Sequence, residues 1–541
     1  AIAGRRPGDY AWSRRKPMPS FRNLDATSAF RALADTPAYD VSRLDAARVP
    51  AMQIPIAAGL RFSYAAAPVD EQIVTRLGAL AEEQELIDKY RMLAEGAVMN
   101  TGEQRMVLHH LLRGQLGAEV VHDGRNQRSF YNEQQQRVAT FAGALRSGAE
   151  LTPGGARYTS VVQIGIGGSD LGPRALYLAL EQWAKAQGID CIEARFISNV
   201  DPDDAAAVLS DLDLSTTLFV LVSKSGTTQE TLTNEQFVRE LAARRAPDID
   251  IMRQTVAVTS QTSPMATGGG YRDAFFIDDF IGGRYSATSA VGGVVLSVAF
   301  GPEVFQQILD GAHAADRAAL ETDITRNAAL LDAMIGLYER NVCGWPSTAV
   351  LPYSQALSRF PAHLQQLDME SNGKRVNRDG QPVSYATGPL VFGEPGTNGQ
   401  HSFYQLLHQG TDVVPLQFVG FRHSQRGEDT EFDGSTSQVK LNANLAAQVV
   451  AFARGRSHEN ANKHFPGGRP STLIVGDRLT PEALGALLAH FENKVMFQGL
   501  AWNINSFDQE GVQLGKMLTK EVLGGSAGAE LSAYASLLGI G

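Results

Sequence analysis

Cysteine is scarce in this chain. Among 541 residues the thiols are those of Cys191 and Cys343, which stand far apart and in no spacing typical of metal ligands. A disulfide framework needs several paired cysteines, and a structural zinc site needs short, regular ligand spacings. The sequence therefore supports neither, and the scarcity of cysteine favours a protein of the reducing cytoplasm.

A membrane-spanning run is missing as well. The most apolar stretch, around residues 289–300, is short and contains glycine, whereas a helix needs about 20 apolar residues to cross a bilayer. Near the N-terminus Arg5 and Arg6 resemble a twin-arginine export signal, but Pro-Gly-Asp follows where such a signal needs an apolar run. We interpret this end as a basic arm.

Positive charge is in short supply. Basic side chains number 48 against 58 acidic ones, which gives a net charge of −10. This balance disfavours a dedicated surface for nucleic acid or anionic membranes, so an anionic substrate would need a local basic pocket.

The composition and length indicate the class of protein. A content of 43% hydrophobic residues and 53 glycines is typical of α/β enzymes with many tight turns. A length of 541 residues exceeds the roughly 250 to 300 that one core supports, which predicts two domains.

The pattern before residue 150 predicts helices. Apolar residues recur at helical spacing from about Asp70 to Ala94, and Gly96 follows as a stop signal. A second helix is expected near Thr101, because Gln104 stands at the distance of a capping box.

From residue 159 onward strands alternate with helices, which are expected after Gly172 and from Thr227. The first series of strands is expected at residues 160–164, 192–196, 217–222, 255–259 and 275–277, and a second series at 348–352, 413–418 and 472–475. This alternation predicts an α/β fold with parallel, doubly wound sheets, whose ligands bind at the carboxyl ends of the strands. We expect a smaller domain at residues 123–301 and a larger one made of residues 1–122 and 302–541.

The loop GGSDLGP follows a predicted strand and has the composition of a phosphate site. Gly167 and Gly168 let backbone amides approach a ligand, and Ser169 offers a hydroxyl at a helix N-terminus. A tight turn with a capping serine would use the same residues. The loop also resembles a dinucleotide fingerprint, but Asp170 stands where the third glycine is required.

A second loop, SKSGTTQET, collects Ser223, Ser225, Thr227 and Thr228 at the start of a helix. Hydroxyls, free amides and the helix dipole together suit a phosphate dianion, whereas capping alone needs one hydroxyl. The sequence contains neither GxxxxGKS nor GxxxxGKT, so a nucleoside triphosphate site has no support.

Four further segments hold side chains suited to proton chemistry. LQQLDMESNGKR places Glu370 before a turn, where most glutamates are simply solvated. GEPGTNGQHSF delivers His401 to a helix start, where a histidine can cap, pack or act as an acid-base catalyst; His408 is interpreted as structural. In FIGGRYS the glycines place Arg284 on a turn, where it pairs with a surface carboxylate or lies over a developing oxyanion. Lys516, after FDQEGVQLG, by itself indicates a solvated helix lysine.

In this order and spacing, these segments resemble the glucose-6-phosphate isomerase family from about residue 50 onward. IGGRYS and FDQEGVQLGK resemble the family's own signatures, and DMESNGK occurs together with GEPGTNGQH. The resemblance implies two sugar-isomerase (SIS) domains, each an αβα sandwich around a mainly parallel sheet, with N-terminal helices and a C-terminal helical arm. It also implies a homodimer in which the neighbouring subunit donates His401 to the active site.

The resemblance implies a role for each matching residue. Glu370 would move the proton between C1 and C2, Arg284 would stabilise the enediolate oxygen, and His401 and Lys516 would open the sugar ring, with Glu230 orienting the histidine. The residues that match phosphate contacts are Ser169, Ser223, Lys224 through its backbone amide, Ser225 and Thr228. Those that match other substrate contacts are Gly168, Gln366 and Gln509.

The chemistry needs these residue types. A carbon acid beside a carbonyl is weak, so a carboxylate base acts only if a fixed cation meets the charge that it creates, and an arginine stays protonated at any working pH. Neither a metal nor a nicotinamide nor any other cofactor is implied. We expect a cytoplasmic enzyme of glycolysis and gluconeogenesis that acts on a small sugar phosphate and has no nucleic-acid or membrane partner.

Two other functions stay open. An isomerase that acts also on mannose 6-phosphate would use the same base and differ in pocket shape. A non-catalytic sugar-phosphate sensor would keep both phosphate loops, but it has no need for a carboxylate base, an arginine, a histidine and a lysine together.

Overall fold

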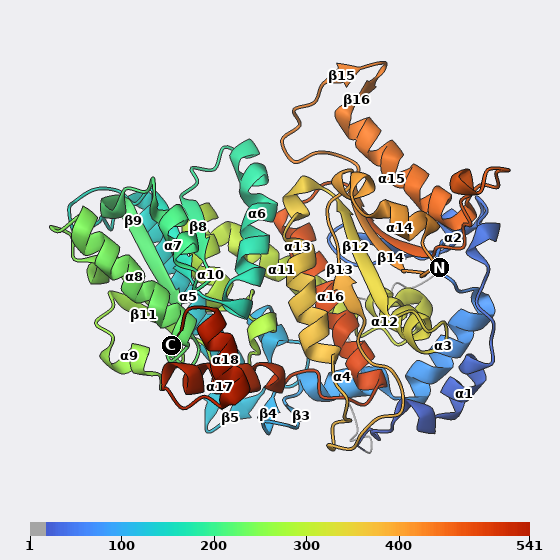
Figure 1. Ribbon diagram of the computed structural model, residues 1–541, viewed down its shortest axis with the longest axis horizontal. Helices are drawn as coiled ribbons and strands as arrows, with labels where there is room; N and C mark the ends of the chain where they lie inside the picture. Colours follow the sequence, from blue (N-terminus) through green and yellow to red (C-terminus); the bar gives the residue numbers. More distant parts are fainter. Residues whose placement is uncertain (1–17, 541) are drawn as a thin grey trace, which may run out of the picture.

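Two mainly parallel sheets lie side by side, each covered by helices (Figure 1). The computed structural model describes residues 18–540, so the basic arm predicted for the first residues lies outside this range. The sheet at the left of Figure 1 has five strands and the sheet at the right has six. The predicted α/β class is confirmed.

The five-stranded sheet is parallel throughout, in the order β11-β10-β9-β7-β8. Its strands are β7 (Ser160–Ile164), β8 (Glu193–Ile197), β9 (Thr217–Val222), β10 (Thr255–Thr259) and β11 (Asp273–Phe276). Every residue of β7, β9 and β10 is buried, which is why these strands are continuous apolar runs and have the predicted bounds. All five strands fall inside 123–301, while the domain boundaries themselves stay a prediction.

Helices cover both faces of this sheet. Apolar residues of α5 (Gln127–Ser147), α6 (Leu171–Ala186) and α10 (Ala290–Phe300) pack on one face, and those of α7 (Pro202–Leu209) and α8 (Gln229–Arg245) pack on the other. The most apolar stretch of the sequence is therefore α10, whose residues are all buried in the core. Within residues 18–540 the structure has no helix long and apolar enough to cross a membrane.

The six-stranded sheet has the order β1-β2-β17-β14-β12-β13. Its parallel strands are β12 (Ser347–Tyr353), β13 (Leu390–Phe392), β14 (Leu416–Phe421) and β17 (Ser471–Gly476). At one edge β2 (Arg61–Ser63) pairs antiparallel with β17, and β1 (Gln53–Pro55) pairs antiparallel with β2.

The expectation of an all-helical start was wrong. Strands β1 and β2 were missed, and the expected helix at 70–94 is two helices, α3 (Glu71–Glu83) and α4 (Leu86–Ala94), separated where Glu85 has a φ of 51°. The helix expected near Thr101 is the turn of a hairpin between β3 (Val98–Asn100) and β4 (Arg105–Met106). Gln104 closes this turn by donating from its side chain to the carbonyl of Thr101, and its φ of 54° is incompatible with a right-handed helix.

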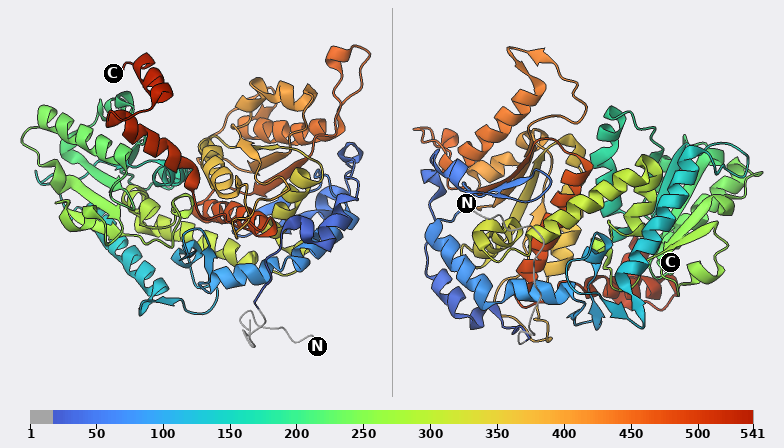
Figure 2. Two further views of the ribbon diagram at one scale, coloured as in Figure 1. Left: turned by 60° about the horizontal axis from the view of Figure 1, so that its bottom comes forward. Right: turned by 180° about the vertical axis from the view of Figure 1, so that it is seen from behind.

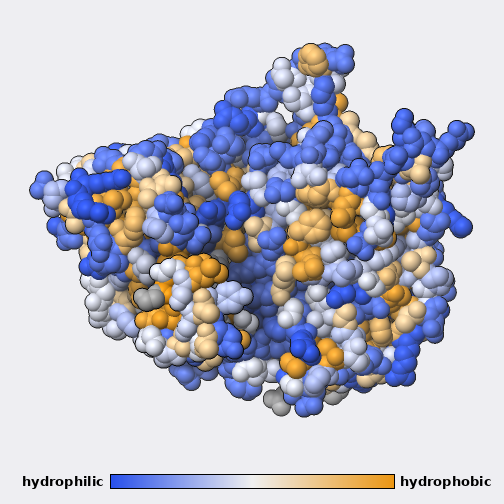
Figure 3. All heavy atoms as spheres, viewed as in Figure 1, coloured by the Kyte–Doolittle hydropathy of each residue, from blue (hydrophilic) through white to orange (hydrophobic). Residues whose placement is uncertain are grey.

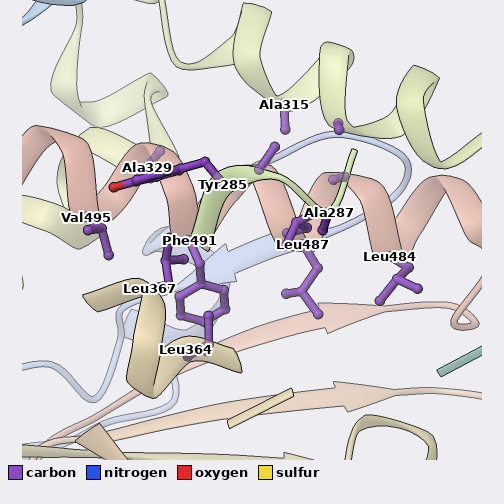
Figure 4. Packing of buried hydrophobic residues seen from close by; sticks show 14 of the residues in the cluster. Tyr285, Ala287, Ala315, Ala329, Leu364, Leu367, Leu484, Leu487, Phe491 and Val495 are labelled. Carbon is purple, nitrogen blue, oxygen red and sulfur yellow. The ribbon is translucent and has the colours of Figure 1, made fainter. Parts of the chain in front are cut away.

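Two long helices of the core, α16 (Pro481–Ala501) and α11 (Pro302–Ala318), pack directly on each other. Helix α16 is buried along its length. A Cβ atom on Gly485 would lie 1.9 Å from the carbonyl oxygen of Ile308, and one on Gly311 would lie 1.9 Å from that of Glu482. Only glycine permits this approach. Figure 4 shows Leu484, Leu487 and Phe491 of α16 packed among residues from several other segments.

The C-terminal helices contrast with this core. Helices α17 (Gln513–Leu523) and α18 (Ala529–Leu537) contain no buried residue and project from the body of the molecule (Figure 2). The other helices are α1 (Ser28–Ala34), α2 (Arg48–Ala51), α9 (Pro264–Gly268), α12 (Ala328–Asn341), α13 (Phe360–Gln365), α14 (Tyr404–Gln409) and α15 (Ser437–Arg454). The remaining strands form the hairpins β5 (Val121–His122) with β6 (Arg125–Asn126), and β15 (Glu431–Phe432) with β16 (Ser435–Thr436).

The glycine contact between α11 and α16 generates a stability prediction. Gly485→Ala should lower the free energy of unfolding by about 1–3 kcal/mol, because the added methyl forces two backbones apart. The matched control is Gly143→Ala on α5, where nothing lies within 4 Å of the added atom and the better helix propensity of alanine should raise stability by up to about 1 kcal/mol. Denaturant unfolding measures both variants, and equal stabilities would contradict the close contact.

Candidate active site

The two hydroxyl-rich loops follow neighbouring strands of the five-stranded sheet at their carboxyl ends. The first loop, after β7, is a 3₁₀ turn from Gly167 to Ser169. A Cβ atom on Gly168 would lie 2.2 Å from the carbonyl oxygen of Gly283, so this glycine lets the loop touch the turn that carries Arg284. On Gly167, which has a φ of 60°, a Cβ atom would lie 3.3 Å from the amide nitrogen of Gln366. The first loop therefore adjoins two other predicted site residues.

The second loop lies between β9 and α8, and its hydroxyls bond to one another. The Ser223 hydroxyl lies 2.9 Å from that of Thr228 and accepts from the backbone N–H of Gly226 at 3.1 Å. The Ser225 hydroxyl accepts from the backbone N–H of Thr227 at 3.2 Å. Thr228 is the N-cap residue of α8 but its side chain caps no amide. The first turn of α8 thus keeps donors for an anion.

Lys224 lies in this loop and ties it to the arginine turn. Its ammonium group donates to the carbonyl of Ile281 at 3.3 Å and lies 3.8 Å from a carboxylate oxygen of Asp279. Burial lowers the pKa of Lys224, and the nearby Asp279 opposes this effect. Lys224 of the second loop, Gly283 of the turn that carries Arg284 and Gln509 near the C-terminus line one small cavity of about 40 Å³.

Arg284 is the centre of the site. It is 1% exposed, on a 3₁₀ turn from Gly283 to Tyr285. Each of its five N–H donors faces an acceptor. The acceptors and their distances are Ser371 Oγ at 2.6 Å, the Ser506 carbonyl at 2.6 Å, the Asp508 carbonyl at 2.9 Å, Gln509 Oε1 at 3.1 Å and Glu370 Oε2 at 3.3 Å. Burial of a guanidinium requires such partners, which also fix its orientation.

Glu370 ends a turn of π-helix, Gln366–Glu370, that continues α13. Its side chain is 22% exposed and pairs with the buried Arg284. Gln366 begins the same turn, and its buried Oε1 atom has no hydrogen-bond partner within residues 18–540. Single π turns inside helices are frequent at functional sites, and this one presents a carboxylate and an amide to the same region.

The sequence analysis did not identify several residues that hold Arg284 and Glu370 in place. Ser371 bridges Arg284 and Tyr285, because its hydroxyl also lies 2.9 Å from the Tyr285 hydroxyl. Lys374 donates to the carbonyls of Glu370 and Ser371, each at 2.9 Å, and pairs with Asp508 at 3.1 Å. Burial lowers the pKa of Lys374 and raises the pKa of Tyr285 to about 12. The serine and the lysine follow Glu370 within DMESNGK, and this adjacency was the available signal.

Three further predicted catalytic residues lie on other segments of the chain. His401 is exposed on a 3₁₀ turn, Asn398–His401, and Lys516 is exposed on α17. Glu230 is half-buried in the first turn of α8. Within the part of the chain that the structure describes, none of these three side chains forms a hydrogen bond or ion pair. His408, by contrast, stacks on Phe452 with 3.7 Å between ring centroids, which confirms its structural role.

A partly exposed carboxylate paired with the buried Arg284, beside loops rich in hydroxyls, is suited to proton abstraction from a carbon next to a carbonyl group in a substrate that also carries an anionic group. Comparison with known proteins identifies the family in which this arrangement belongs. The sequence model described as "Phosphoglucose isomerase" matches residues 63–536.

Curated relatives match over nearly the whole chain. Glucose-6-phosphate isomerase of Treponema pallidum (strain Nichols) is 57% identical over 538 residues, covering 96% of this chain and 98% of the relative. The protein of the same name from Treponema denticola is 55% identical over 528 residues, covering 96% and 99%. The crystal structure of a glucose-6-phosphate isomerase from Chlamydia trachomatis superimposes with a TM-score of 0.88 at 42% identity, covering 96% of this chain and all of that one. The chain belongs to the phosphoglucose isomerase family.

Proposed function

We propose that this protein interconverts glucose 6-phosphate and fructose 6-phosphate, and that Glu370 moves the proton. The observation that carries the proposal is the contact between Glu370 and the buried, fully bonded Arg284 beside two hydroxyl-rich loops. A sensor that only bound the sugar phosphate would gain nothing from a carboxylate held against a buried cation.

The phosphate group is held by the two loops. Ser223, Ser225 and Thr228 lie at the N-terminus of α8, where free amides and the helix dipole attract a dianion. Ser169 contributes a further hydroxyl from the first loop, and Lys224 a backbone amide. Gln366 and Gln509, which lie beside the Glu370 and Arg284 pair, hold the sugar hydroxyls.

Proton transfer takes place in the open-chain sugar. The carboxylate of Glu370 removes the proton from C2 of the aldose, and the electron pair moves through the new C1–C2 double bond onto O1. Arg284 stabilises the negative charge on this enediolate oxygen. Glu370 then returns its proton to C1 while a proton passes from O2 to O1, which leaves the carbonyl at C2 and the ketose as product.

Ring opening precedes this step and needs a proton on the ring oxygen and a base at the anomeric hydroxyl. His401 and Lys516 are suited to share these tasks, with Glu230 orienting the histidine. Both His401 and Lys516 are exposed and lack partners among residues 18–540. This exposure supports a site completed by a second subunit, which contributes His401.

The apolar surface of the C-terminal helices supports the same homodimer. Figure 3 shows hydrophobic side chains over α17 and α18, and Leu514, Met517 and Leu523 of α17 are 62%, 51% and 63% exposed. On α18 Leu537 is 79% exposed. Such contiguous apolar surface is typical of protein interfaces, and a symmetric contact between two copies would bury it on both subunits.

We also propose the cytoplasm as location, consistent with two unpaired cysteines.

The role of Glu370 has a direct test. Glu370→Gln keeps the shape but removes the base, so kcat for fructose 6-phosphate should fall by about 10²- to 10⁴-fold or more. In deuterated water the variant should also stop placing deuterium on C1 and C2, which NMR detects. The matched control is Glu459→Gln at an exposed loop position, which should behave as the wild type. A folded Glu370→Gln protein with wild-type kcat would show that Glu370 is not the base. A parallel assay with mannose 6-phosphate defines the substrate range.

The shared site predicts complementation between two inactive variants. Glu370→Gln and His401→Ala homodimers should each be inactive, yet a mixed dimer would pair an intact Glu370 with an intact His401 at one of its two sites. After denaturation and refolding of an equal mixture, about a quarter of wild-type activity should therefore return. Mixing without any gain in activity would show that His401 acts within its own subunit, and sedimentation analysis confirms that mixed dimers have formed.

A further inference from the structure

A second cavity adjoins the π turn, and Arg284 is not among the residues that line it. Two residues apart on a helix, Asp368 and Glu370 point in different directions. Glu370 reaches Arg284, whereas Asp368 lines a cavity of about 20 Å³ together with residues of α12, α16 and the strands β12, β13 and β14. The polar residues that line this inner cavity are Thr348, Glu339, Asp368, Gln417, Lys494 and Gln498.

The inner cavity contains polar atoms that need a partner. Asp368 is 8% exposed and Gln498 is 2% exposed, yet Asp368 Oδ1 and Gln498 Oε1 accept no hydrogen bond within residues 18–540. Lys494 donates to Asp332 Oδ1 at 2.8 Å, which occupies one of its three N–H groups. A buried acceptor that no donor reaches loses the hydrogen bond that water gives it in the unfolded chain, so these two oxygen atoms favour a bound donor.

One water molecule satisfies this set. A buried water needs roughly 10–15 Å³ of free space and two to four polar partners. It would donate its two hydrogens to Asp368 Oδ1 and Gln498 Oε1 and accept from Lys494. A metal ion fits less well, because the described residues contain no group of three metal-ligating side chains and an ammonium group lies in the same wall.

The neighbouring contacts show what such a bond would hold in place. Leu364 and Leu367 fix one side of α13 and its π turn by packing near Phe491 of α16 (Figure 4). Apolar packing alone allows rotation about the helix axis, whereas a directional hydrogen bond from Asp368 does not. Rotation of this turn would swing Glu370 away from the substrate carbons.

We propose that the inner cavity binds one ordered water molecule and that Asp368, bonded to it, is a positioning residue that sets the aim of Glu370. The part that concerns Glu370 rests on the proposed isomerase activity. Burial of Asp368, which raises its pKa to about 7, agrees with a carboxyl group held inside the protein rather than in solvent.

The kinetic test compares three variants with fructose 6-phosphate. Asp368→Ala should lower kcat by about ten- to a hundredfold and leave KM within about twofold, because a displaced base loses transition-state contact and not substrate binding. Asp368→Asn keeps an oxygen acceptor and should stay within about threefold of the wild type. Glu339→Gln changes another wall of the same cavity, on α12, and should keep wild-type kcat.

Two structural readouts do not depend on activity. A high-resolution crystal structure of the wild type should show a water within hydrogen-bond distance of Asp368 Oδ1 and Gln498 Oε1, and amide hydrogen exchange at residues 366–372 should quicken in Asp368→Ala but not in Glu339→Gln. A dry cavity, unchanged kcat in Asp368→Ala, or equal effects of Asp368→Ala and Glu339→Gln would overturn the proposal. A wild type that fails to isomerise the sugar would refute the proposed function, and hydrogen exchange would still decide whether Asp368 holds the turn.

Discussion

The geometry of the site depends on one buried cation. Arg284 lies on a turn between strand β11 and helix α10. Its acceptors belong to the end of the π turn, to Ser371 after it and to the loop before α17. A guanidinium taken out of water costs several kcal/mol unless every donor is bonded, so these segments are held together by the need to satisfy it. Arg284 is therefore both the electrostatic centre of the site and the tie between the two sheets.

Buried charges recur along the helix that supports this arrangement. On α16, Glu492 bonds to the buried Arg113, which also pairs with Asp316 of α11 at 3.1 Å. Two residues before and two residues after Glu492, His490 and Lys494 bond to Asp332 of α12. Removing one member of such a pair leaves an uncompensated charge, at a cost of about 3–5 kcal/mol. These pairs specify how α16 lies against α11 and α12, and hence where the π turn packed on it must lie.

The sequence predicts much of this fold where the signal is local. Strands β7, β9 and β10 are continuous apolar runs between turn residues, so their bounds agree with the pattern. Strands β1, β2 and β13 have three residues each, which is too short for a local period to reveal. Strand β2 pairs with β17 and β13 pairs with β12, both far along the chain, and β1 joins the sheet only through its hairpin with β2. In the site, the composition of the loops after β7 and β9 was enough to predict a cluster of serine and threonine hydroxyls. The π turn could not be predicted, because LQQLDMES has the composition of an ordinary helix.

The edge of the six-stranded sheet has a consequence for synthesis of the chain. Strand β2 pairs with β17, so a segment made among the first residues waits for one made near residue 471. The five-stranded sheet has its strands between residues 160 and 276 and is complete long before then. Domains generally fold as they leave the ribosome, N-terminal parts first, but the six-stranded sheet cannot be completed in that order. Until β17 is translated, the edge of β2 that will pair with it has no partner, and the nascent chain must keep this edge from pairing with other strands.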